Sequence, residues 1–173
     1  MYNDKLIDEK TYKYLTSNPN PRAGRFYILP KIHKQGNPGR PIISSNGHPT
    51  ERISEFVDYH LNLLYRHCHP TSKTRRTHFS NCRILASSSK TLCSSRLMFL
   101  PNIPHKEGEE ACRHFLNTRP QKSIPTERIC DLIRMILGMN NFSFNGQHFL
   151  ETHGTAMGTR MAPSYANLFI GKF

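Results

Sequence analysis

The sequence has few acidic residues, no long apolar run and no closely paired cysteines. Its 173 residues include 24 Lys and Arg but only 12 Asp and Glu, so the formal net charge is +12. No stretch approaches the roughly 18 apolar residues of a membrane span, and the polar segment Met1–Lys10 does not resemble a signal peptide. The excess of positive charge therefore points to a polyanionic partner. Nucleic acid is favoured over an acidic membrane, because no amphipathic basic helix stands out.

Cysteine usage is sparse and scattered. The five cysteines lack the spacing of a disulfide framework, which predicts a reducing, intracellular compartment. The run His67-Cys68-His69, with Cys82 and Cys93 further along, leaves a zinc site open as an alternative. No C-x-x-C pair supports that alternative.

Common catalytic signatures are also missing. There is no G-x-S-x-G elbow of a serine hydrolase, and the loop Gly154–Gly158 matches neither a Walker A motif nor G-x-G-x-x-G. Glycines in such a loop indicate a backbone that passes close to another group or needs a positive φ angle. A structural turn remains the simpler interpretation of these residues alone.

Acidic residues disappear entirely over one long stretch. Arg66–Pro101 carries seven Lys and Arg and no Asp or Glu; the nearest acids are Asp58 and Glu107. The stretch shows no sustained helical or strand periodicity. A flexible basic arm that binds phosphates and a plain loop are both open interpretations.

The remaining pattern predicts an α+β fold. Helices are expected over residues 5–15, 50–64, 106–116 and 126–137, and a further helix, with Pro163 near its start, follows the glycine loop. Strands are expected over residues 26–29 and 41–44, joined by a turn. A second hairpin is expected over residues 142–150, because Asn145-Gly146 suits a type I′ turn.

Basic residues gather around the first expected hairpin. Arg40 follows a Gly-rich turn, with Lys31 and Lys34 nearby in the sequence. Arg binds phosphate oxygens in a bidentate manner, so the segment suits a triphosphate or a nucleic-acid backbone. A solvated basic hairpin explains these residues equally well.

Five segments, taken together and in order, resemble the reverse transcriptase of Penelope-like retroelements. They read "FYILPKIHK", "GRPIISSNGHPTERISEFVDYHLN", "NIPHKEG", "NNFSFNGQHFL" and "HGTAMGTRMAPSYANLF". The resemblance covers residues 25–64 and 102–173. It implies a partial right-hand polymerase fold, with fingers, part of the palm, and an incomplete antiparallel palm sheet with packed helices. The implied division is an N-terminal extension (1–24), fingers (25–65), a degraded basic segment (66–101) and a partial palm (102–173).

The resemblance also implies site residues. Arg40 would lie near the triphosphate of the incoming nucleotide, and Met157 and Gly158 would line the nucleotide pocket. Met157 stands where the pattern "G-x-x-Q-G-x-x-x-S-P" of other reverse transcriptases has Gln. Nucleic-acid contacts would come from Lys31, Lys34 and Arg160. The implied partners are an RNA and DNA template-primer and deoxynucleoside triphosphates, in the nucleus if the chain behaves as a retroelement protein.

The metal-binding carboxylates of the family are not recognisable. Nucleotidyl transfer needs two Mg²⁺ ions held by carboxylates. The family takes one Asp from a strand reading "LDVSSLYTNIPH" and two from an Asp-Asp hairpin. Here "RLMFLP" precedes "NIPH", and the sequence ends at Phe173 before such a hairpin. We therefore expect no catalytic or metal-binding residue, no bound Mg²⁺ and no polymerisation.

Two further outcomes remain open. The chain is alternatively a non-catalytic, basic nucleic-acid-binding protein, or a pseudogene product without a role. Without the central palm strand, the apolar faces of residues 126–137 and 142–150 are expected to stay exposed.

A shifted reading frame would explain the basic stretch. If Arg96–Pro101 is encoded CGC TTG ATG TTT CTT CCC, the frame two bases later reads Leu-Asp-Val-Ser-Ser. We hypothesise that residues 67–101 are translated out of frame. The coding DNA tests this, because a shifted frame with any other reading would contradict the hypothesis.

Overall fold

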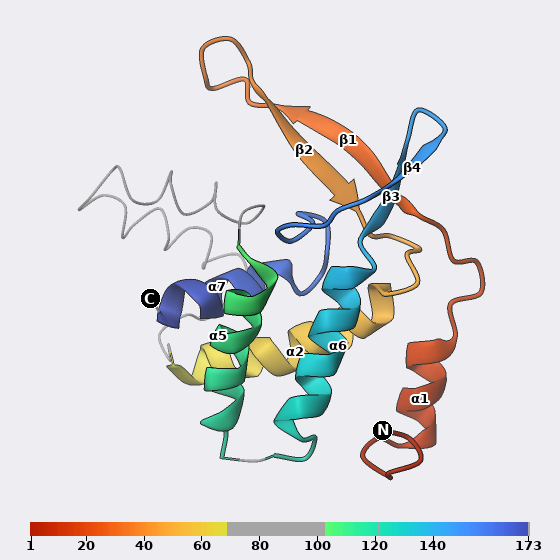
Figure 1. Ribbon diagram of the computed structural model, residues 1–173, viewed down its shortest axis with the longest axis vertical. Coiled ribbons are helices and arrows are strands. Elements are labelled where there is room, and N and C mark those ends of the chain that lie inside the picture. The colour runs from red at the N-terminus through yellow and green to blue at the C-terminus, as the bar shows by residue number, and fades with distance from the viewer. Residues whose placement is uncertain (69–102, 121, 173) are drawn as a thin grey trace.

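Helices and a four-stranded mixed sheet make up the described part of the chain, which is thus α+β (Figure 1). The computed structural model describes residues 1–68, 103–120 and 122–172. The basic segment expected at 66–101 therefore lies outside the description, except for the end of α2. The elements are α1 (Glu9–Thr16), β1 (Gly24–Pro30), β2 (Gly39–Ser44), α2 (Glu51–Cys68), α5 (His105–Asn117), α6 (Thr126–Gly138), β3 (Asn141–Phe144), β4 (Gln147–Leu150) and α7 (Ala162–Lys172).

Two antiparallel hairpins join side by side to form the sheet, in the order β2-β1-β3-β4. Tyr27 pairs with Ile42 in the first hairpin, and Phe142 pairs with Phe149 in the second. Strands β1 and β3 run parallel, with Gly24 opposite Phe142. The resemblance implies an antiparallel sheet, so this parallel pair differs from that expectation. It is possible because the helices between the hairpins supply the long connection that parallel strands need.

The second hairpin has the turn that its sequence predicts. Asn145 and Gly146 both have positive φ angles, 49° and 76°. A type I′ turn requires this at both central residues and matches the twist of the flanking strands. The predicted hairpin is therefore confirmed.

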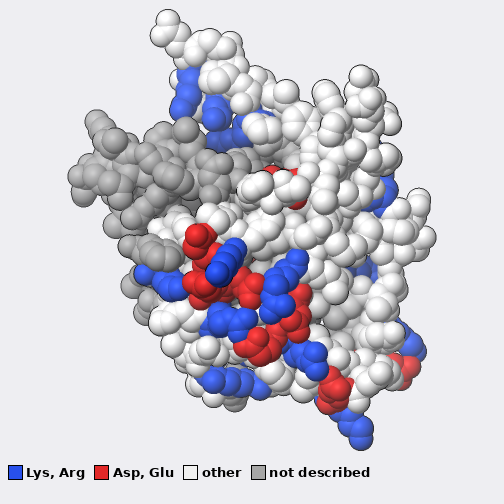
Figure 2. All heavy atoms as spheres, viewed as in Figure 1, with Lys and Arg blue, Asp and Glu red and all other residues white. Residues whose placement is uncertain are grey.

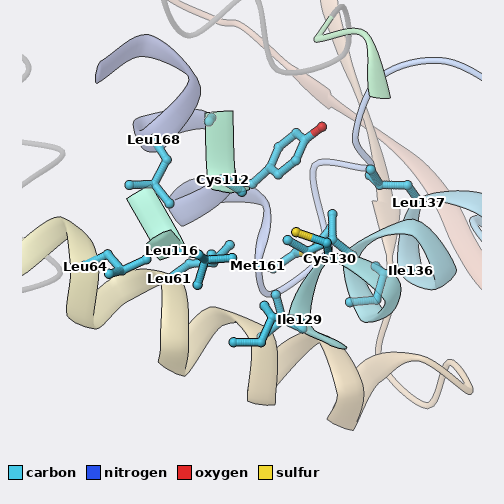
Figure 3. Packing of buried hydrophobic residues seen from close by; sticks show 14 of the residues in the cluster. Leu61, Leu64, Cys112, Leu116, Ile129, Cys130, Ile136, Leu137, Met161 and Leu168 are labelled. Carbon is cyan, nitrogen blue, oxygen red and sulfur yellow. The ribbon is translucent and has the colours of Figure 1, made fainter. Parts of the chain in front are cut away.

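The hydrophobic core lies among the helices rather than under the sheet. Apolar side chains of α2, α5, α6 and α7 meet between these helices, and Met161 joins them from the preceding loop (Figure 3). Ile129, Ile133 and Ile136 of α6 are completely buried. The expectation that this face of α6 stays exposed is wrong, because α2 and α5 pack against it.

The second hairpin keeps the exposure expected of it. Phe144, Phe149 and Leu150 are 52%, 42% and 55% exposed. Figure 1 shows why: both hairpins project from the helices in the same general direction and diverge toward their tips. Their far ends therefore lack a covering layer in the described structure.

The N-terminal helix docks on α2. Asp8 accepts a hydrogen bond from the Thr11 amide at 2.9 Å, so α1 begins later than the sequence predicts. Tyr14 donates its hydroxyl proton to Glu55 at 2.6 Å, and Arg52 lies over the Tyr14 ring. Residues 1–24 therefore pack partly on the segment expected to form the fingers.

Candidate nucleic-acid interface

The tip of the β1–β2 hairpin carries three of the predicted site residues. Arg40 lies on β2 opposite Leu29. The Lys31 amide donates to Pro38 O, and the Lys34 amide donates to Lys31 O, both at 3.0 Å. These backbone bonds close the turn and hold the two lysines beside the end of the strand that bears Arg40. The structure thus brings Lys31, Lys34 and Arg40 to one end of one hairpin.

No acidic residue opposes these cations within the hairpin. Between Glu9 and Glu51 the sequence has seven Lys and Arg and no Asp or Glu. The four strands and their two turns also contain no acid. In Figure 2, basic atoms gather beneath the hairpin tip, while the acidic atoms lie mainly over the helices. This gap in acidic residues is readable in the sequence.

The backbone geometry explains why the loop Gly154–Gly158 has glycine at both of these positions. Gly154 has φ 77°, a left-handed value that favours glycine. Gly158 forms a bridge to Ser44 at the end of β2, and a Cβ placed on it would lie 1.9 Å from Ile43 O. Ser45 also donates a hydrogen bond to Gly158 O at 2.7 Å. The loop thus shows both features that its glycines predict, a positive φ angle and a close backbone approach.

Arg40 lies near the start of β2, whereas the glycine loop contacts the other end of this strand. Arg40 precedes Ser44, the partner of Gly158, by four residues, which corresponds to ~13 Å along a strand. Met157 is half-buried beside Gly158. The predicted nucleotide-binding residues therefore line one strand and do not form a single compact pocket.

Arg160 has acidic partners on α2. Its guanidinium lies 3.0 Å from Glu51 and 3.8 Å from Glu55. The hydrogen bond with Glu51 raises the pKa of Arg160. A phosphate at Arg160 would have to compete with these carboxylates, so its predicted contact with nucleic acid is the one least supported by its surroundings.

Glu51 is held at the start of α2 by two donors. Its carboxylate accepts hydrogen bonds from the Gly47 amide at 2.7 Å and from Arg160. Burial opposes ionisation, but these two donors outweigh it and lower the pKa of Glu51. The carboxylate therefore stays ionised and ties the loop before α2 to the loop before α7.

Two histidines connect the site to the rest of the molecule, and sequence reasoning assigned neither. His48 is buried; its Nδ1 accepts from the Thr50 amide at 3.2 Å, and its Nε2 lies 2.7 Å from Asn141 Oδ1. His105, from the "NIPH" segment, places Nε2 2.7 Å from Gly154 O. The segments around residues 45 and 105 thus each contact the glycine loop, which only the folded chain reveals.

Metal ligands do not gather in the described residues. No group of three or more His, Cys, Asp or Glu side chains there could hold a metal ion. Burial raises the pKa of Cys112, and it raises that of Cys130 to about 11, so both thiols stay protonated. The zinc alternative at residues 67–69, 82 and 93 falls on side chains outside the description. Among the helices described, none combines the length and apolar character needed to cross a membrane.

Comparison with known proteins gives no relative on which to base a function. The chain matches no family model, no curated protein and no solved structure.

Proposed function

We propose that this chain binds nucleic acid through the β1–β2 hairpin. The observation that supports the proposal is the set of cations Arg25, Lys31, Lys34 and Arg40 on a sheet whose strands and turns contain no acidic residue. Basic groups on a projecting element make contacts with phosphates that do not depend on base sequence. The two arginines of α6, by contrast, lie within ion-pair distance of carboxylates.

We further propose that the chain is a fragment of a reverse transcriptase domain of the Penelope-like type and does not polymerise. The sequence resemblance supports the first part. Contacts between its separate motifs, His105 with Gly154 and Gly158 with Ser44, are consistent with it. The replacement of the Asp-bearing strand by "RLMFLP" before "NIPH" supports the second part, since hard oxygen ligands are needed for Mg²⁺.

Salt-dependent binding tests the proposed interface. Fluorescence anisotropy with a short labelled RNA measures affinity over a series of salt concentrations. In the triple variant Lys31→Gln, Lys34→Gln, Arg40→Gln, the log–log slope should become shallower by about 2, because each phosphate contact contributes ~0.7 on a single strand.

A charge-matched control separates the hairpin from net charge. Lys10→Gln, Lys13→Gln, Lys122→Gln removes the same charge from exposed positions outside the sheet. Equal losses in the two triple variants would contradict the hairpin interface. A wild-type chain that binds no RNA even at low salt would contradict nucleic-acid binding altogether.

Primer extension distinguishes the two candidate functions. The purified chain is incubated with an RNA template, a DNA primer, deoxynucleoside triphosphates and Mg²⁺. We expect binding without incorporation. Incorporation that depends on Mg²⁺ would contradict the proposed loss of activity and favour a working polymerase.

A further inference from the structure

Four phenylalanine rings lie together on one face of the sheet. Phe26 comes from β1, Phe142 and Phe144 from β3, and Phe149 from β4. Ring centroids are 5.7 Å apart for Phe26–Phe142, 5.1 Å for Phe26–Phe144 and 5.5 Å for Phe142–Phe149. We call these four residues the Phe platform.

Strand registers place the Phe platform on a single face. Side chains of directly paired residues point to the same side of a sheet, and alternate residues share a side. Phe26 is two residues from Gly24, which pairs with Phe142, and Phe142 pairs with Phe149. Tyr27 lies on β1 next to Phe26 and therefore points to the opposite face.

Packing within the sheet accounts for two of the four phenylalanines of the Phe platform but not for the two exposed ones. Phe26 and Phe142 are half-buried, as expected for the centre of a small sheet. Phe144 and Phe149 remain 52% and 42% exposed, and Ile28 on the same face is 58% exposed. A connected apolar surface of this kind usually marks an interaction site.

We infer that the Phe platform stacks on unpaired bases and that the sheet prefers single-stranded nucleic acid to duplex. This inference rests on the proposed function. The strands and turns that carry the Phe platform contain only basic charges. Lys31 and Lys34 lie at the tip of the β1–β2 hairpin, whereas Arg40 on the edge strand β2 pairs with Leu29 and so points, like Tyr27, to the opposite face. Aromatic rings on a sheet whose edge strand and hairpin tip carry cations suit a single strand, because bases can stack on the rings while phosphates contact the cations at the edge and the tip. In a duplex the bases are already stacked and cannot lie on the rings.

Substitution of the two exposed rings tests the inference. Phe144→Leu with Phe149→Leu keeps apolar bulk but removes the aromatic faces. Affinity for a single-stranded oligonucleotide should fall by at least about tenfold, whereas affinity for a duplex of the same sequence should stay unchanged. Tyr27→Leu is the matched control, because Tyr27 is as exposed as Phe149, at 42%, but points to the other face. It should leave the ratio of the single-strand affinity to the duplex affinity unchanged.

Several outcomes would overturn the inference. An equal loss for single strand and duplex, no loss for either, or the same loss in the Tyr27 variant would each contradict stacking on the Phe platform. Light scattering measures the oligomeric state and so tests the alternative that a second copy of the chain binds this face. A wild-type dimer that the double Leu variant converts to monomers would overturn the inference in favour of self-association.

Photo-cross-linking provides a second test that needs no variant. Ultraviolet light joins a uridine-rich single strand to side chains that its bases touch, and mass spectrometry locates the joined peptide. Cross-links should appear in the peptide that contains residues 142–149. Cross-links confined to the helices would contradict the inference even if the strand binds. Wild-type protein that binds neither single strand nor duplex would instead refute the proposed function.

Discussion

Gly158 shows how one missing side chain positions a whole loop. Its backbone lies so close to β2 that an added Cβ would stand 1.9 Å from Ile43 O and 2.9 Å from Ser44 Cα. These are backbone atoms and cannot move away as the end of a flexible side chain can. The glycine is therefore needed for the contact between the loop and the sheet, whatever the loop binds.

Substitution at this position is expected to destabilise the fold. Gly158→Ala should lower the free energy of unfolding by about 1–3 kcal/mol, because the methyl group forces β2 and the loop apart. Urea unfolding measures the effect. Gly138→Ala is the control: no atom lies within 4 Å of its added Cβ, and alanine in a helix should stabilise by up to ~1 kcal/mol. Similar effects of the two changes would contradict the close contact.

Helix α2 begins where three segments of the chain meet. Glu51 accepts from the Gly47 amide and pairs with Arg160, while His48 connects the same loop to Asn141 on β3. A carboxylate in the first turn of a helix also interacts favourably with the helix dipole. The start of α2 therefore couples the β1–β2 hairpin, the glycine loop and β3.

The lowered pKa of Glu51 predicts a pH-dependent contribution to stability. The pKa of Glu51 in the folded protein lies below the ordinary value of a glutamate, because the Gly47 amide and Arg160 donate to its carboxylate. The stabilisation is therefore present above that value and is lost as the pH falls through the folded pKa. Unfolding free energies of wild type and Glu51→Gln should differ by about 1 kcal/mol near neutral pH, and the difference should shrink in acid.

A surface carboxylate supplies the control for this prediction. Glu9 pairs with Lys13 at 2.6 Å, but its side chain is 63% exposed, so Glu9→Gln should change stability little at any pH. If the Glu51 difference stays constant from neutral to acidic pH, its carboxylate does not stabilise the fold in its ionised form.

At the scale of the whole molecule, one helical core supports a sheet that extends from it. Buried residues of all four core helices belong to a single cluster, while much of the apolar surface of both hairpins faces solvent. Figure 1 shows this division between the helices and the diverging hairpins. Stability should thus come mainly from the helices, and binding surface mainly from the sheet.

A shared core predicts cooperative unfolding. Circular dichroism at helical wavelengths should show a single thermal transition, as for a folded domain. Ile133→Ala should lower the free energy of unfolding by about 2–5 kcal/mol, because Ile133 is completely buried. Met135→Ala on the exposed side of the same helix should change it by less than about 0.5 kcal/mol. A gradual loss of signal without a transition would contradict the single core.

Much of the local structure could be predicted from the sequence. The Asn145-Gly146 turn, the hairpin with strands at 26–29 and 41–44 and the apolar period of α6 were readable from the sequence, because turn residues and side-chain periodicity act over a few neighbouring residues. The predicted roles of Arg40, Met157 and Lys34 stay predictions. The pairing of Arg160 with Glu51 was not readable, since the two residues are far apart in the sequence.

The sequence by itself determined the α+β class, the turns and the basic character of the chain. Only the tertiary structure decided that β1 pairs with β3 in parallel, that α2 and α5 cover α6, and that Gly158 lies against Ile43. The physical reason is the distance along the chain over which each interaction acts. Backbone preferences and charge belong to each residue and its neighbours, whereas pairing, burial and close approach depend on which distant faces pack together.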